Sequence, residues 1–132
     1  MNSPALNNLA LLASRILLSA IFIQAGWGKL MGYSSGGPQK YMEAMGVPGV
    51  LLPLVILTEL GLGLMVLVGF KTRIAAFLLA GFSLLAGLLF HFKLGDQGQM
   101  IHFMKNVAIA GGFLSLMVAG AGAYSVDAKL GK

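Results

Sequence analysis

Four long apolar stretches, separated by short polar or glycine-rich breaks, occupy most of the chain. Each is long enough to cross a bilayer as an α-helix, which needs about 20 mainly apolar residues. Little sequence is left over for a second unit, so we predict a single all-α membrane domain over residues 1–132, folded as an antiparallel four-helix bundle. The predicted spans cover approximately residues 9–31, 50–70, 74–92 and 104–124.

The break between the first two spans has a pattern of its own. Tyr41, Met42 and Met45 recur at helical spacing, and Pro38 and Pro48 bound the segment. Tyrosine and methionine side chains suit the interface between lipid and water. We therefore predict a short helix over residues 39–45 that lies on the membrane surface, with an irregular loop as the alternative.

Composition strengthens the membrane assignment and limits the chemistry. Of the residues, 58% are hydrophobic and 10% are charged, whereas a soluble domain carries roughly 25% charged residues. The net charge is +5, but the lysines and arginines stand singly near span ends, which favours anionic lipid head groups over nucleic acid as their partner. The absence of cysteine excludes thiolate metal sites and cysteine nucleophiles.

The distribution of positive charges predicts the orientation. Cytoplasmic loops of membrane proteins carry an excess of lysine and arginine. Residues 1–14 lack the positive region of a cleavable signal peptide. We expect a multi-pass protein of the bacterial inner membrane with both termini in the cytoplasm. The cations on the cytoplasmic side would be Arg15, Lys71, Arg73, Lys129 and Lys132, against Lys29, Lys40, Lys93 and Lys105 on the other side.

Glu59 lies near the middle of the second span, where a carboxylate has no water. A charge there costs at least about 2.5–3.5 kcal/mol, so something must pair with it or use it. Helical rise places Glu59 roughly 13 Å and Lys29 about 3 Å below the outer surface. Side chains lean toward the N-terminus of their own helix, so these two lean toward each other. We predict Lys29 as the counter-ion of Glu59.

Other polar side chains gather on the same side of the bundle, which predicts a cavity open to the outer side. His91 continues a face of small residues, Ala80, Ser83 and Gly87, and is expected to face inward. The alternative role for the polar residues near span ends is anchoring at the membrane interface, and for Gln24 it is a hydrogen bond between helices. The candidate ligand-binding residues are Gln24, Trp27, Glu59, His91, Lys105 and Asn106.

Arg15 and Asp127 are interpreted as structural residues that anchor the chain or form ion pairs. Arg15 leans toward the cytoplasm, so we expect its side chain to extend to the membrane surface. No metal site is predicted. Met100 to Met104 resembles a copper(I) ligand set, but on a helix both methionines would point away from His102. A haem held by His91 and His102 would rest on two histidines alone.

Several segments, in order, resemble the DoxX family of small four-helix bacterial inner-membrane proteins, and its YqjF-like branch in particular. These segments are Ala25-Gly26-Trp27-Gly28-Lys29-Leu30, Thr58-Glu59-Leu60-Gly61-Leu62-Gly63-Leu64, Gly69-Phe70-Lys71-Thr72-Arg73, Lys105-Asn106, Gly111-Gly112, and Gly120 to Asp127. The resemblance implies a membrane subunit of a quinone-linked oxidoreductase or a component of an oxidative-stress complex. The residues that match the family's polar positions are Arg15, Lys29, Glu59, Lys105, Asn106 and Asp127.

The function we expect is that of a quinone-interacting component of such a complex. Glu59 would exchange protons with a quinone head group or hydrogen-bond it, and Lys29 would tune its charge; Trp27, His91 and Phe92 would line the entrance. No cofactor would be covalently bound, the ligand would be a quinone or a lipid, and electrons would come from another subunit. The expected partners are membrane lipid, other membrane or redox subunits, or a second copy. The alternatives are a non-enzymatic membrane scaffold or assembly factor and a small transporter.

Overall fold

The computed structural model describes residues 3–91 and 95–131, without the side chains of Phe90 and His91. The prediction of an all-α fold is confirmed, since every regular element in the described residues is helical. Four helical stretches are long and apolar enough to cross a membrane. They are α1 (Pro4–Met31), the stretch Gly49–Val68, α5 (Thr72–Ala86) with its continuation η4 (Gly87–His91), and α6 (Gln97–Ala119).

The second span changes its helical type along its length. It begins with the 3₁₀ turn η2 (Gly49–Leu51) and α3 (Leu52–Ile56), with Pro53 in the first turn of α3, where its missing N–H group costs nothing. The π-helical segment η3 (Leu57–Leu62) follows, and α4 (Gly63–Val68) completes the span. Gly69 then ends the helix in the left-handed region, with φ 77°. Glu59 therefore lies on a widened turn in the middle of the span.

Three predicted boundaries are wrong. α1 begins at Pro4 rather than at residue 9, because the Ser3 hydroxyl caps it by accepting a hydrogen bond from the Leu6 N–H group. α6 begins at Gln97 rather than at residue 104, because the Asp96 carboxylate caps it in the same way. It ends at Ala119, so the predicted last turn, residues 120–124, is not helical. Both helices have polar residues near their starts, so the apolar pattern in the sequence starts later than the helix does.

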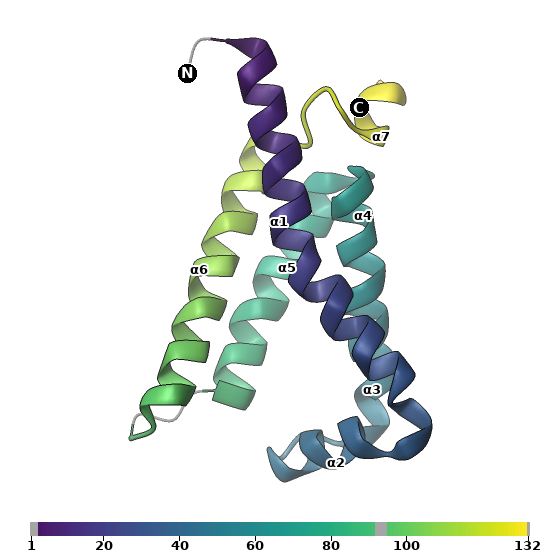
Figure 1. Ribbon diagram of the computed structural model, residues 1–132, viewed down its shortest axis with the longest axis vertical. Coiled ribbons are helices and arrows are strands. Elements are labelled where there is room, and N and C mark those ends of the chain that lie inside the picture. Colours follow the sequence, from purple (N-terminus) through teal and green to yellow (C-terminus); the bar gives the residue numbers. More distant parts are fainter. Residues whose placement is uncertain (1–2, 92–94, 132) are drawn as a thin grey trace.

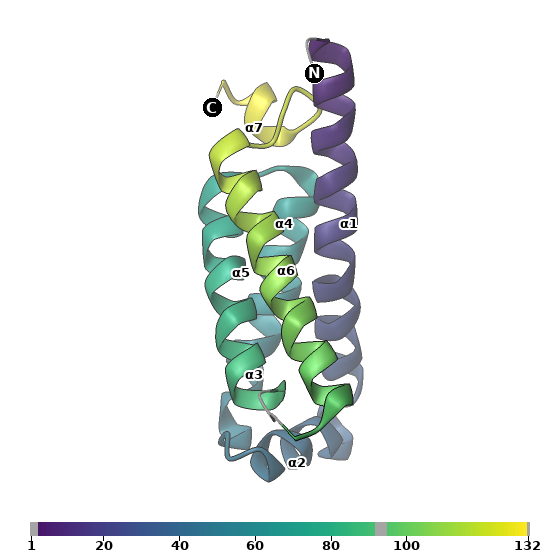
Figure 2. The same ribbon diagram turned by 90° about the vertical axis from the view of Figure 1, so that its left-hand side faces the viewer.

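The four spans alternate in direction, and both chain termini lie at the same end of the bundle (Figures 1 and 2). We call this end, which also holds α7 (Val126–Lys129), the closed end. At the opposite end, the 3₁₀ turn η1 (Tyr33–Ser35) leads into α2 (Gly37–Ala44), which lies across the bundle (Figure 1). This is the helix predicted over residues 39–45. We call the end of the bundle that holds α2 the cavity end.

Small side chains let the helices of the core approach closely. α5 and α6 share the most extensive contact between two helices, and Ala76, Ala80 and Ala110 are buried there. Small residues provide such contacts in lipid, where the helices gain little from hydrophobic burial. Phe22 of α1 fills the centre and meets Phe113 of α6 edge to face, with ring centroids 5.6 Å apart.

Arg15 is fully buried, so the prediction that its side chain extends to the membrane surface is wrong. Its guanidinium donates to the carbonyl oxygen of Leu67, at 3.0 Å, and to that of Tyr124. Both carbonyls belong to the closed end, where the segment 120–131 folds back toward the bundle (Figure 2) and supplies Tyr124. A buried charge is tolerated where hydrogen bonds replace its water.

Charged side chains also satisfy two helix ends at the closed end. The carboxylate of Asp127 accepts hydrogen bonds from the backbone N–H groups of Lys71, at 2.7 Å, and Thr72, at 2.9 Å, at the start of α5. Arg73 donates to the carbonyl oxygens of Met117 and Val118, at the end of α6. These groups have no partner within their own helices. The predicted structural role of Asp127 thus corresponds to a cap on α5, beside Arg15, which it attracts.

Candidate functional site

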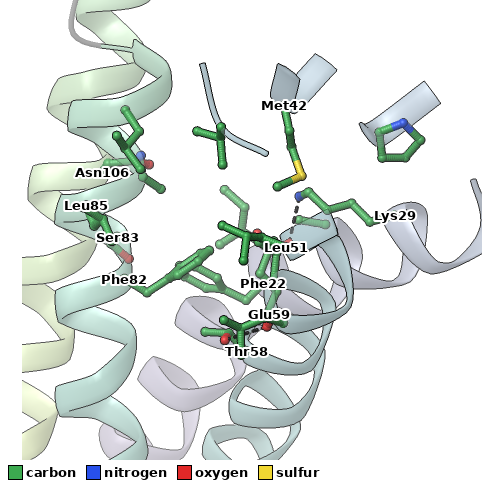
Figure 3. Close-up of a pocket in the computed structure, with 18 of the residues that line it drawn as sticks. Phe22, Lys29, Met42, Leu51, Thr58, Glu59, Phe82, Ser83, Leu85 and Asn106 are labelled. Atoms are coloured by element: carbon green, nitrogen blue, oxygen red, sulfur yellow. Dashed lines mark hydrogen bonds and ion pairs between the residues drawn. The ribbon is translucent and has the colours of Figure 1, made fainter. Parts of the chain in front are cut away.

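A cavity of about 690 Å³ lies between the spans at the cavity end. Residues of α1, α2, the second span, α5 with η4, and α6 line it (Figure 3). Its walls are mostly apolar, and the volume is that of a pocket for a small organic molecule. The polar side chains among its lining residues are Gln24, Lys29, Tyr41, Thr58, Glu59, Ser83 and Asn106.

An ion pair forms one wall of this cavity. The Lys29 ammonium donates to the Glu59 carboxylate, with 2.7 Å between Nζ and Oε1. The Glu59 side chain is 9% exposed and that of Lys29 is 30% exposed, so the pair is sheltered but reachable from the cavity. The pairing predicted from helical depth is present in the structure. A pair in such surroundings attracts more strongly than one in water.

Gly26 brings the two partners of the ion pair together. A Cβ atom at Gly26 would lie 2.9 Å from the backbone nitrogen of Leu60, the residue after Glu59. The glycine therefore allows α1 to touch the backbone of η3. Lys29 lies one turn further along α1, from where its side chain reaches back to the carboxylate of Glu59.

The opposite wall carries a second, smaller group of polar side chains. Ser83 of α5 and Asn106 of α6 lie across the cavity from Lys29 and Glu59 (Figure 3). Ser83 is almost fully buried and Asn106 is half-buried. The two walls therefore present polar atoms toward each other across an apolar space.

Aromatic rings and a methionine fill the space around these groups. Phe22 and Phe82 both line the cavity and contact each other edge to face, with ring centroids 6.2 Å apart. Met42 of α2 is 2% exposed and reaches in from the end of the bundle, beside Lys29 (Figure 3). A flat apolar ligand would have aromatic and polarizable partners here.

The structure brings some of the candidate ligand-binding residues together and separates others. Gln24, Glu59 and Asn106 all line the cavity. Trp27 does not, and it is 56% exposed, because the helical turn directs it away from the side that carries Lys29. Lys105 also lies outside the cavity and is exposed. The side chain of His91, and Phe92 as a whole, fall outside the described residues.

Most of the apolar cavity wall was not predicted from the sequence. The lining side chains Phe22, Met42 and Phe82 carry no polar signal in a chain where apolar residues are the rule. Ser83 had a signal, since it lies on the predicted face of small residues. The described residues contain no group of three or more potential metal-ligating histidines or carboxylates.

Comparison with known proteins places the chain among inner-membrane proteins. The family model described as DoxX matches residues 10–92. The inner membrane protein YqjF of Escherichia coli strain K12 is 53% identical over 127 residues, which cover 96% of each chain. The inner membrane protein YphA of the same organism is 36% identical over 126 residues, which cover 90% of this chain and 89% of YphA. No solved structure matches the chain significantly.

Proposed function

This chain belongs to the DoxX family and is a multi-pass inner-membrane protein, and we propose that its cavity binds the head group of a membrane quinone. The observation that carries the proposal is the Lys29–Glu59 pair, held in the wall of an otherwise apolar cavity. A charged pair in a membrane span is a candidate functional site because burying it costs free energy. The resemblance to quinone-linked family members points in the same direction.

The cavity wall offers the groups that a quinone needs. The Lys29 ammonium has donors beyond the one that Glu59 uses, and these can hold a quinone carbonyl. Reduction of a quinone to a quinol consumes two electrons and two protons. Glu59 would take up a proton from water and pass it to the ring oxygen that Lys29 holds, with Lys29 compensating the change in charge, and the second proton would come from water. The electrons would come from a separate redox subunit, in line with a role as one component of a complex.

A scaffold without ligand is the second candidate, and the same ion pair supports it. The pair connects α1 to the second span, 30 positions apart in the sequence. A bond of this kind can fix the register of two helices. In that case the Lys29–Glu59 pair would serve only to stabilise the fold, and the chain would act as an assembly partner of other membrane subunits.

Glu59→Gln discriminates between the two candidates. For a quinone site, we expect the variant to fold but to lose quinone binding. Solvent extracts of the purified original chain should then contain ubiquinone or menaquinone, and extracts of the variant should not. Added quinone should also raise the melting temperature in detergent for the original chain and not for the variant, because a ligand stabilises the state that it binds. Glu43→Gln is the matched control: the same change at an exposed carboxylate outside the cavity lining.

Exchanging the two charges adds a second test. The double variant Lys29→Glu with Glu59→Lys restores the ion pair in the opposite sense. A scaffold should regain both stability and partner assembly, whereas a quinone site should regain only stability. An original chain that carries no quinone after purification, and whose melting temperature does not respond to added quinone, would refute the quinone site.

A further inference from the structure

The cavity has a hydrogen-bonding group on the wall opposite the ion pair, and this second group is Asn106 (Figure 3). The neighbouring Ser83 hydroxyl donates to the carbonyl oxygen of Leu79, at 2.8 Å, and so keeps only its lone pairs for a ligand. The Asn106 amide has two N–H bonds and a carbonyl oxygen. Asn106 is therefore the hydrogen-bond donor of this wall.

Gly87, the first residue of η4, provides the space in which Asn106 lies. A Cβ atom at Gly87 would lie 3.3 Å from the Cβ atom of Asn106 and 3.4 Å from its Nδ2 atom. Such contacts are tighter than ordinary packing, so Asn106 lies close to Gly87 because that residue has no side chain. The side chain of Asn106 is thus positioned by its neighbours rather than left free in the cavity.

The ion pair on one wall of the cavity and Asn106 on the other each adjoin a π-helical segment. Glu59 belongs to η3, and Gly87, against which Asn106 packs, is the first residue of η4. Single π-helical turns within membrane or soluble helices are rare, and they occur frequently at functional sites. Two of them, on different spans and on opposite walls of one cavity, indicate a site with two binding poles.

We propose that the cavity recognises its ligand at two opposite edges, with Lys29 donating to one carbonyl oxygen and Asn106 Nδ2 donating to the other. This inference rests on the proposed function and says how the site would hold a para-quinone, whose two carbonyls project from opposite sides of a flat ring. Phe22 and Phe82 supply the apolar surface between the poles. A molecule with a single polar head, such as a fatty acid, would leave Asn106 without a partner in the complex.

Two probes of similar shape test the inference: 1,4-naphthoquinone, with two opposed carbonyls, and 1-tetralone, with one. Dissociation constants are measured by titration calorimetry in detergent for the original chain and for Asn106→Leu, which keeps the side chain's size. We expect naphthoquinone to bind about five- to tenfold more weakly to the variant, as the loss of one hydrogen bond implies. The affinity for tetralone should change less than about twofold, because one carbonyl can still use Lys29.

Two further variants keep the test decisive. Lys105→Gln changes the adjacent, exposed residue outside the cavity and should leave both affinities unchanged. Gly87→Ala forces Asn106 to shift by a few tenths of an ångström and should reduce the preference for naphthoquinone, even where Asn106→Leu fails to fold.

The failures of the two proposals are distinguishable. Equal weakening of both probes by Asn106→Leu, or no weakening of either, would overturn the two-pole site. If Glu59→Gln still abolished naphthoquinone binding, the quinone site would stand without its second pole. Absence of naphthoquinone binding to the original chain would remove both proposals.

Discussion

The two ends of this bundle use their charged residues in opposite ways. At the closed end, Arg15 and Asp127 bind backbone atoms of other segments of the chain. At the cavity end, Lys29 and Glu59 bind each other beside an open space. The first arrangement joins segments that are far apart in the sequence. The second leaves donor and acceptor capacity that the fold does not use.

This difference separates stability from binding within one small membrane domain. Polar groups that bind buried backbone atoms contribute to stability and are costly to remove, because their partners then remain unsatisfied in a dry interior. Polar groups that face a cavity are available to a ligand. Substitutions at the closed end should therefore lower the melting temperature, and substitutions at the cavity end should mainly lower affinity.

Arg15→Met should have the largest effect on stability. It leaves the carbonyl oxygens of Leu67 and Tyr124 without their donor, and we expect a loss of about 3–4 kcal/mol. Thermal unfolding in detergent measures the loss. Arg15→Lys should lose less, because it keeps the charge but not the forked geometry. A loss smaller than that of Glu59→Gln would contradict the assignment of stability to the closed end.

Asp127→Ala should have an intermediate effect, about 1–2 kcal/mol, because two backbone N–H groups of α5 lose their acceptor and Arg15 loses an attractive charge. Asp96→Ala is the matched control at the cavity end. There the carboxylate accepts from the Gln99 N–H group of its own helix, and the expected cost is about 0.5–1 kcal/mol. Equal costs in thermal unfolding would show that Asp127 contributes no more to stability than a cap within its own helix does.

Gly26→Ala and Gly28→Ala should have smaller effects than Arg15→Met, with opposite signs. A new Cβ atom at Gly26 meets the backbone of Leu60, whereas one at Gly28 meets nothing within 4 Å. Replacing a helical glycine by alanine gains about 1 kcal/mol where space allows, so Gly28→Ala should raise the melting temperature. Gly26→Ala should lower it by a similar amount and weaken the Lys29–Glu59 contact. Stabilisation by both would argue against close packing of α1 on η3.

The sequence predicted the features of this fold that depend on local geometry. Span number and fold class follow from the lengths of the apolar stretches, and the Lys29–Glu59 contact follows from helical rise and side-chain direction. The start of α6 was missed because Gln97 and Gln99 in its first turn read as loop. The burial of Arg15 was missed because it depends on a segment more than a hundred positions away.

The second pole of the cavity was predictable only in part. Asn106 was a candidate because it is polar near the start of a span, and Lys105 and Trp27 were candidates for the same kind of reason. The choice among them depends on which helical face meets the cavity. Neither π-helical segment has a signature in the sequence, so the close fit of Gly87 to Asn106 could be found only in three dimensions.

The π-helical segment η3 also sets the angular register of the second span. A π-helical turn holds about one residue more than an α-helical turn, so α3 and α4 are rotated relative to a uniform helix by roughly 100°, the angle of one residue. Deleting one residue between Leu57 and Leu62 would let the stretch relax to a regular α-helix of nearly the same length. The shortened protein would keep the half of the span before the deletion and the half after it on their present faces toward α1, because the lost residue and the lost widening of the turn offset each other. A change that relaxed η3 to an α-helix without deleting a residue would instead turn one half away from α1 by roughly 100°.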